Sequence, residues 1–291
     1  MEVIENPESI HLDLPTNDNC HFINPFQLVR DKITGSKTCL VILNQEIAIS
    51  PELFERIWGN CELRICADGG GDRLLEYSTK HGKTESYLPH YIIGDLDSLS
   101  DGTKKFYEDR GVTVKQQWSQ WHSDLDKSIV LCDLYFNRGN IDLNKLDDED
   151  GLFKLDSETP KSETEVSILL LSAIGGRFDQ TIHSINKLFV YSETKPNLDI
   201  KLWNSGFDEM ILLIKKGENF VFLPGDKKNY NVGLLPLGQR VNLSTRGLKW
   251  DVTHWESHIY GSVSSSNRTV ADTGFWIETD EALVVNLQIE M

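Results

Sequence analysis

The sequence has no excess of positive charge, and this excludes several kinds of partner. Its 291 residues include 45 Asp and Glu but only 29 Lys and Arg, for a formal net charge of −16. A mostly anionic surface repels nucleic acid and anionic lipid, so we expect neither as a partner. Any phosphate group that this protein binds must therefore be held locally, by metal ions, backbone N–H groups or a few basic residues.

Cysteine is scarce, and the positions of the cysteines exclude a zinc-binding module and a disulfide-stabilised module. The cysteines form no pair of C-x-x-C units of the zinc-binding type, and their odd number does not suit a disulfide framework. We expect free thiols in a reducing compartment. The five residues are Cys20, Cys39, Cys61, Cys66 and Cys132.

Long apolar runs are also absent. No stretch reaches the length that crosses a bilayer, and the first residues, MEVIENPESIHLDLPTND, lack the basic start and apolar centre of a signal peptide. These absences predict a cytoplasmic protein.

With 39% hydrophobic and 9% aromatic residues, the chain can bury one large core or two moderate ones, and its first part alternates predicted strands with predicted helices. Because consecutive parallel strands need helical crossovers, this alternation predicts an α/β, Rossmann-like domain with a mostly parallel sheet. Strands are expected at 38–44, 63–68, 90–95, 113–116 and 166–176, and helices at 51–58, 72–77, 103–111, 124–137 and 178–193.

From about Met210 the pattern changes to short apolar runs separated by Gly, Pro, Asn and Asp every ten or so residues. This is typical of an antiparallel all-β sandwich, of jelly-roll-like type. We therefore expect a two-domain protein. Its parts are an N-terminal extension (1–35), an α/β domain (36–209) with a polar, acidic insertion at about 137–164, and a β-sandwich domain (210–291). The insertion is predicted to be a solvated or mobile loop.

Acidic residues follow several predicted parallel strands. Asp68 lies in ICADGGGD, Asp95 and Asp97 lie in YIIGDLDS, and Asp124 lies in WHSDLDKS. Since the carboxyl ends of parallel strands form the ligand crevice of such sheets, we expect these carboxylates to converge. An extended loop would aim Asp95 and Asp97 the same way, and Mg²⁺ prefers such oxygen ligands. Taken singly, each is more often a turn residue or helix cap, and only the group favours a metal site.

Two glycine-containing segments precede predicted helices and are candidates for phosphate contact. Gly69 and Gly70 follow Asp68, and Gly175-Gly176 lead to Arg177 and Asp179. Bare backbone N–H groups at a helix start can receive phosphate oxygens, and an arginine can fork onto a phosphate. Tight turns with a surface Arg–Asp pair are the alternative. Neither segment matches the dinucleotide fingerprint or the Walker A loop.

One basic residue is placed to act beside these acids. Lys127 follows Asp124 by one helical turn on the same face, so it can offset charge on a phosphoryl group, although exposed helical lysines are common.

In the β-domain, Trp250 and the run Ser264–Asn267 offer an aromatic face and small polar groups for a heterocycle. A core tryptophan and a polar loop are the alternatives there.

The segments ADGGGDRL, IIGDLDS, QWHSDLDK, GGRFDQTIHSINKL, STRGLKW and SSSN, in this order between about Cys39 and Met291, resemble the motif set of the thiamin pyrophosphokinase family. The resemblance implies an α/β domain that carries ATP and Mg²⁺, a thiamin-binding β-sandwich, and a homodimer with active sites between subunits. The implied reaction moves the pyrophosphoryl group of ATP onto the hydroxyl of thiamin, giving thiamin diphosphate and AMP.

The resemblance also implies a role for each matching residue. Asp68, Asp95, Asp97 and Asp124 are the implied metal ligands, and the last three with Lys127 are the implied catalytic group. ATP is implied to contact Asp68, Gly69, Gly70, Arg177 and Asp179, and thiamin to contact Gln120, Trp250, Ser266 and Asn267. One departure is Asp126, since the family more often has an uncharged residue before the lysine.

Two other functions fit parts of the pattern. Acidic strand ends alone also suit another metal-dependent phosphotransferase or phosphohydrolase, and a retained pocket suits a non-catalytic thiamin or nucleotide sensor. The β-domain motifs argue against a hydrolase, which needs no acceptor pocket, and the full set of acids argues against a sensor.

Overall fold

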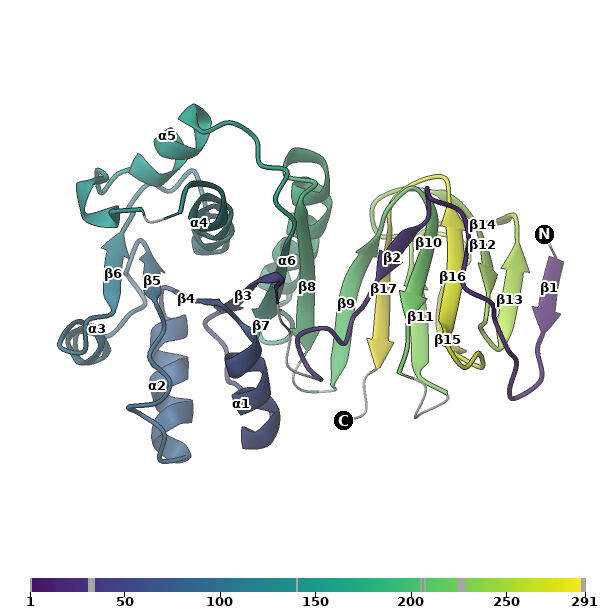
Figure 1. Cartoon of the computed structure of the whole chain (residues 1–291), viewed down its shortest axis with the longest axis horizontal. Coiled ribbons are helices and arrows are strands. Elements are labelled where there is room, and N and C mark those ends of the chain that lie inside the picture. Colours follow the sequence, from purple (N-terminus) through teal and green to yellow (C-terminus); the bar gives the residue numbers. More distant parts are fainter. Residues whose placement is uncertain are drawn as a thin grey trace. The chain divides into compact units, whose positions relative to one another are not determined.

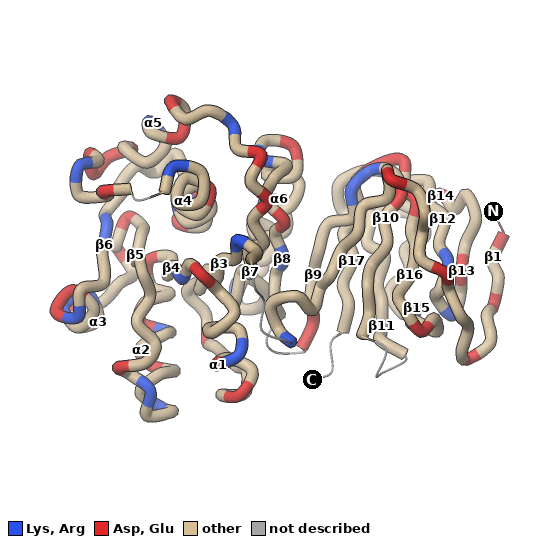
Figure 2. The backbone as a smooth tube through the Cα atoms, in the orientation of Figure 1, with Lys and Arg blue, Asp and Glu red and all other residues tan. Residues whose placement is uncertain are grey.

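The computed structural model describes residues 2–30, 35–139, 141–204, 206, 208–224 and 229–288. The chain divides into two compact units, which are described separately (Figure 1). The α/β unit spans Leu28–Gly206, and the β unit combines Met1–Gln27 with Phe207–Met291. Acidic positions occur in both units (Figure 2). None of the described helices is long and apolar enough to cross a membrane.

The α/β unit is built on a parallel sheet in the order β8-β7-β3-β4-β5-β6. Its strands are β3 (Lys37–Ile42), β4 (Leu63–Ala67), β5 (Tyr91–Gly94), β6 (Thr113–Gln116), β7 (Val166–Leu171) and β8 (Leu198–Asn204). Its helices are α1 (Pro51–Asn60), α2 (Gly70–Lys80), α3 (Asp101–Glu108), α4 (Asp124–Arg138), α5 (Gly151–Glu158) and α6 (Phe178–Thr194), with a short 3₁₀ turn η1 (Leu143–Lys145).

The sheet is covered on both faces, which explains its near-continuous apolar strands. Every residue of β7 is buried, as expected of a central strand in a parallel sheet. In Figure 1, α1 and α2 lie on one face and α4 and α6 on the other. The strand order reverses between β3 and β7, and ligand crevices of open α/β sheets form at such a switch point.

The β unit contains mainly antiparallel sheets. One has the order β14-β12-β16-β10-β2, another contains β15-β11-β17-β9, and β1 pairs with β13. Its strands are β1 (Glu2–Glu5), β2 (His21–Ile23), β9 (Glu209–Ile214), β10 (Gly217–Phe222), β11 (Asn231–Leu235), β12 (Val241–Arg246), β13 (Trp250–Thr253), β14 (Trp255–Ser257), β15 (Ser264–Arg268), β16 (Gly274–Thr279) and β17 (Leu283–Gln288). The predicted class, an α/β domain followed by a β-rich domain, is confirmed.

The structure differs from the sequence expectations at the N-terminus and in the acidic insertion. The N-terminal extension is part of the β unit, because β1 pairs with β13 and β2 pairs in parallel with β10. The acidic insertion, predicted to be a solvated or mobile loop, contains η1 and α5, with Leu143 and Leu152 buried. That expectation was wrong for these residues, because a few apolar side chains are enough to anchor a mostly polar segment.

Candidate active site

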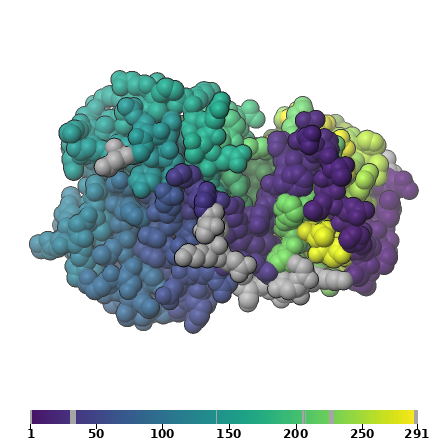
Figure 3. Space-filling view, in the orientation of Figure 1, coloured from purple at the N-terminus to yellow at the C-terminus, as the bar shows by residue number. Residues whose placement is uncertain are grey.

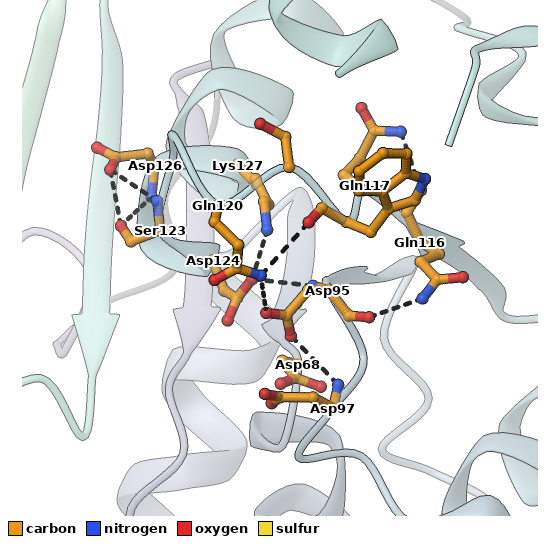
Figure 4. A network of polar contacts seen from close by, with 12 residues as sticks. Asp68, Asp95, Asp97, Gln116, Gln117, Gln120, Ser123, Asp124, Asp126 and Lys127 are labelled. Atoms are coloured by element: carbon orange, nitrogen blue, oxygen red, sulfur yellow. Dashed lines mark hydrogen bonds and ion pairs between the residues drawn. The ribbon is translucent and has the colours of Figure 1, made fainter. Parts of the chain in front are cut away.

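Three carboxylates meet at the carboxyl edge of the parallel sheet. Asp68 follows β4, Asp95 follows β5, and Asp124 is the first residue of α4. Each offers one oxygen, and the three oxygens lie within 4.8 Å of one another. Figure 4 shows these side chains facing a common space. Among the described residues, this is the one His, Cys, Asp and Glu group with metal-binding geometry.

Glycine at position 94 makes this convergence possible. A Cβ on Gly94 would lie 2.7 Å from the Cβ of Asp68 and 3.1 Å from Oδ1 of Asp124. Both are closer than ordinary van der Waals contact. The last residue of β5 therefore has to lack a side chain so that the flanking acids can approach.

Backbone amides fix the Asp68 carboxylate. Its two oxygens accept hydrogen bonds from the backbone N–H groups of Ser98 and Leu99, each at 3.1 Å. Burial, with added repulsion from Asp124, raises the pKa of Asp68 to about 6 despite the Ser98 contact. Burial likewise raises the pKa of Asp124. Carboxylates that are held together without an equal positive charge are in the environment that a cation would stabilise.

Asp95 is held from three sides. Its carboxylate accepts a hydrogen bond from Nε2 of Gln120 at 2.8 Å and one from the Asp97 N–H at 3.2 Å. Its own N–H donates to Oδ1 of Asp124 at 3.1 Å. Burial opposes ionisation, but the contacts with Gln120 and Asp97 and the charge of Lys127 leave the pKa of Asp95 lowered.

Asp97 does not belong to the group of three. Leu96 has φ +65°, so the loop between the two aspartates is not extended as predicted. The Asp97 carboxylate is exposed and accepts a hydrogen bond from the Ser98 hydroxyl at 2.9 Å. Its role as a metal ligand remains a prediction.

Lys127 contacts the cluster as its spacing suggested. Its Nζ donates to Oδ1 of Asp124 at 3.0 Å, and its side chain is 1% exposed. Burying an ammonium group is costly unless a partner compensates it, so this lysine is held in place by the acids beside it.

The capping box of α4 accounts for the departure at Asp126. Ser123 caps the helix and accepts from the Asp126 N–H, while Oδ2 of Asp126 accepts from the Ser123 N–H and hydroxyl. Asp126 also forms an ion pair with Lys187 at 2.9 Å and accepts from the Tyr191 hydroxyl, both on α6. An acid here therefore fixes the start of the helix that carries Asp124. The S-x-x-D spacing was the sequence signal for it.

The glycines after Asp68 serve close packing. A Cβ on Gly69 would lie 2.4 Å from Nδ2 of Asn44, and one on Gly70 would lie 2.2 Å from the carbonyl oxygen of Ile42. Helix α2 starts here, close to the end of β3. The contact of Gly69 and Gly70 with phosphate remains a prediction. The close approach of this segment to the end of β3 by itself requires residues without a side chain at these two positions.

The second predicted phosphate segment lies after β7, beside the switch point. Arg177 and Asp179 form a two-point ion pair, with Nη2 to Oδ2 at 2.5 Å and Nε to Oδ1 at 3.1 Å, and their side chains are 73% and 63% exposed. Gly175 and Gly176 both have positive φ and lie against Gln45, which donates to the Gly175 carbonyl at 2.7 Å. The structure does not bring this pair into the cluster of three acids.

Comparison with known proteins gives the chain a family. Residues 54–202 match the model "Thiamin pyrophosphokinase, catalytic domain", and residues 214–284 match "Thiamin pyrophosphokinase, vitamin B1 binding domain". The chain is 37% identical to thiamine pyrophosphokinase of Saccharomyces cerevisiae, over 99% of this chain and 96% of that protein. This chain belongs to the thiamin pyrophosphokinase family.

Solved structures agree with that assignment. The yeast thiamin pyrophosphokinase structure is 35% identical, with a TM-score of 0.91, covering 100% of this chain and 98% of that one. The thiamin pyrophosphokinase from Candida albicans is 34% identical, with a TM-score of 0.87, covering 99% and 98%. The resemblance inferred from the motifs is confirmed.

The part that matches the vitamin B1 binding domain of the thiamin pyrophosphokinase family holds the remaining predicted residues. Trp250 begins β13 with 40% of its surface exposed. Asn267, on β15, is buried and pairs with the Trp250 backbone, accepting from its N–H at 3.2 Å and donating to its carbonyl at 2.8 Å. Ser266 is exposed. Asn267 thus fixes the Trp250 backbone, and the alternatives of a core tryptophan and a polar loop do not hold, since the indole is partly exposed and the Ser-Asn run forms β15.

Another residue holds the same turn and was not anticipated. Buried Asp251 accepts hydrogen bonds from the Thr245 hydroxyl and from the N–H groups of Gly247 and Leu248, and from the Asn6 amide of the N-terminal segment. Since Asp251 directly follows Trp250, this network sets where the indole is presented. Thr245, Gly247 and Leu248 lie within six residues of Asp251, whereas Asn6 is 245 residues away, so no local pattern could show that last contact.

Proposed function

We propose that this chain transfers the pyrophosphoryl group of ATP to the hydroxyl of thiamin, giving thiamin diphosphate and AMP. The observation that supports this best is the group of Asp68, Asp95 and Asp124 at the carboxyl edge of the parallel sheet, in a chain that belongs to the thiamin pyrophosphokinase family. We also propose a cytoplasmic location, from the sequence alone.

The acids fit Mg²⁺ as the metal. The donor set is made of carboxylate oxygens, which a hard cation prefers, and burial together with the neighbouring Asp124 raises the pKa of Asp68, so a cation would stabilise its charged form. Asp68, Asp95 and Asp124 would hold the ion, with Asp97 at its margin. When bound, Mg²⁺ supplies positive charge that stabilises the phosphate oxygens during transfer.

The work of the protein's own residues is mainly orientation. Lys127, buried against Asp124, adds a fixed positive charge to the cluster and would offset charge on a phosphoryl group held there. Gln120 holds Asp95 and lies where it can also meet a bound substrate. In phosphoryl transfer, positioning and electrostatics supply most of the rate, so rigid placement of these groups is the contribution to expect.

For ATP, we propose contacts with the segments that follow β4 and β7. Gly69 and Gly70 lie at the start of α2 beside β3, and Arg177 and Asp179 lie at the start of α6 after β7. The arginine is exposed and its ion pair is of the surface kind, which contributes little to stability, so it can exchange Asp179 for a phosphate.

For thiamin, we propose Trp250, Ser266 and Asn267 of the β-sandwich domain (210–291). An indole that is 40% exposed and fixed through its backbone offers a face to a cationic thiazolium, a contact worth about 1 kcal/mol. The α/β domain (36–209) would carry ATP and Mg²⁺. We further propose a homodimer with active sites between subunits, as the family resemblance implies.

The test is a direct assay of the purified chain with ATP, Mg²⁺ and thiamin, read by mass for thiamin diphosphate and AMP in equal amounts. Removal of the metal with a chelator should stop both products. ATP cleavage at the same rate without thiamin would indicate a hydrolase, and thiamin or ATP binding without products would indicate a sensor.

A further inference from the structure

Part of the acidic insertion (residues 137–164) is ordered against the segment that leads into the active site. That segment, residues 115–122, runs from the end of β6 to the start of α4. Because β6 is the outermost strand of the α/β unit's sheet, one side of this segment has no neighbouring strand in the sheet. Figure 3 shows the teal atoms of the insertion on the surface of this unit.

Backbone hydrogen bonds join the two segments. The Trp118 N–H donates to the carbonyl of Asp148 at 2.8 Å, and the Ser119 N–H donates to that of Glu149 at 3.0 Å. The insertion thus takes the place of a partner strand just beyond the end of β6.

Gln117 connects the insertion to the sheet. Its side chain is buried, at 1% exposure, and its Nε2 donates to the carbonyl of Asp147 at 2.5 Å while its Oε1 accepts from the Leu152 N–H at 2.8 Å. Its backbone N–H donates to the carbonyl of Gly94 at 2.7 Å. One residue therefore links the insertion to the strand end that precedes Asp95.

The segment also contacts the insertion through residues before and after Gln117. Buried Lys115 donates to the carbonyl of Leu146 at 2.6 Å and forms an ion pair with Asp148 at 2.7 Å. At the other end, the rings of His122 and Phe153 stack with centroids 3.5 Å apart and planes at 9°. Residues 146–153 of the insertion thus contact the segment along its whole length.

The same segment carries the side chains that hold Asp95. Gln116 donates to the Asp95 carbonyl at 2.8 Å, and Gln120 donates to its carboxylate at 2.8 Å (Figure 4). We propose that residues 146–153 act as a positioning element for the active site, which through Gln117 and Phe153 holds Gln120 against Asp95. This inference rests on the proposed function, and it gives the insertion a defined task within it.

The test is a double-mutant cycle on turnover, with thermal unfolding measured for every variant. Gln120→Ala removes a hydrogen bond to a carboxylate, and we expect turnover to fall about tenfold or more. Gln117→Ala should give a loss of similar size. Because both act on one contact, the double variant should be no slower than the worse single one. Effects that multiply in the double variant, or normal turnover of Gln117→Ala, would overturn the proposal.

Phe153→Ala provides a second arm, which decides the matter if Gln117→Ala does not fold. It removes the stack on His122, and the same non-additivity with Gln120→Ala is expected. Lys145→Ala is the matched control, since it lies in the same insertion, its side chain is 82% exposed, and its ion pair is with Asp142, the residue that caps η1. It should leave turnover unchanged.

Two readouts separate this inference from the proposed function. Hydrogen exchange should show slow exchange of the Trp118 and Ser119 amides in the unaltered chain and clearly faster exchange in Phe153→Ala but not in Lys145→Ala. Calorimetry with ATP and Mn²⁺ should show severalfold weaker binding in Gln117→Ala. If the unaltered chain made no thiamin diphosphate, the proposed function would fail, and these readouts would still decide whether the insertion orders the segment and the cluster.

Discussion

Replacing Gly94 by alanine tests the geometry of the three acids without touching any of them. The added Cβ would lie 2.7 Å from the Cβ of Asp68, about 0.7 Å short of the 3.4 Å at which ordinary contact begins. It would also lie 3.1 Å from Oδ1 of Asp124. One of the two carboxylates, or the end of β5, therefore has to move by several tenths of an ångström.

Misplacing a catalytic group by about 1 Å can cost on the order of 10²-fold in rate, so we expect Gly94→Ala to lower turnover by about 30- to 100-fold. Overpacking in a well-packed region also destabilises by about 1–3 kcal/mol, so thermal unfolding must be measured beside turnover. The assay is thiamin diphosphate formation at saturating ATP and thiamin, well below the unfolding temperature.

Gly102→Ala is the matched control. Gly102 lies in the first turn of α3, and a Cβ there meets nothing within 4 Å. Its turnover should be normal. Normal turnover of Gly94→Ala in a folded protein would refute the argument that the three acids must approach this closely in order to act.

Further substitutions test the separate assignments. Asp95→Asn should lower turnover by about 10²- to 10³-fold while the fold survives, because it removes charge from the cluster. Asp97→Asn should have the smaller effect. Equal effects of the two variants in steady-state assays would place Asp97 inside the metal site. Trp250→Ala should raise the KM for thiamin more than the KM for ATP, and an unchanged thiamin KM would count against stacking. If active sites are shared between subunits, mixing Asp95→Asn with Trp250→Ala, at a thiamin concentration well below the KM of Trp250→Ala, should give more activity than the sum of the two variants through hybrid dimers. No increase after subunit exchange would argue against sharing. The five buried cysteines should react with a thiol reagent only on unfolding, since burial raises the pKa of Cys61 and Cys66 well above the usual range; rapid labelling of the folded protein would contradict this.

How far the fold follows from the sequence depends on how local each signal is. The strands beginning at 37, 63, 91 and 166 are short, mostly apolar runs, and they form within a few residues of their predicted positions, as does the more polar strand at 113. Strand β8 was not predicted, because its buried Lys201, which pairs with Asp199, interrupts the apolar pattern. Strands β1 and β2 were missed because they are only four and three residues long and are defined by partners more than 190 residues away.

In the candidate site too, features with a regular or local signal could be predicted and the others could not. That Asp68, Asp95 and Asp124 converge could be predicted, since parallel strands bring their carboxyl ends to one edge. That Asp97 is not in the group depends on the positive φ of Leu96, which a leucine gives no reason to expect. Gln116 and Gln117 were not anticipated, because a glutamine has no distinctive spacing and their partners belong to a separate loop and to the insertion.

The most direct test of the central claim is a crystal structure of the unaltered protein with Mg²⁺ and a non-cleavable ATP analogue. The account predicts a cation about 2.1 Å from carboxylate oxygens of Asp68, Asp95 and Asp124, bridging to the phosphates of the analogue. A nucleotide bound with its metal away from these three residues would contradict it.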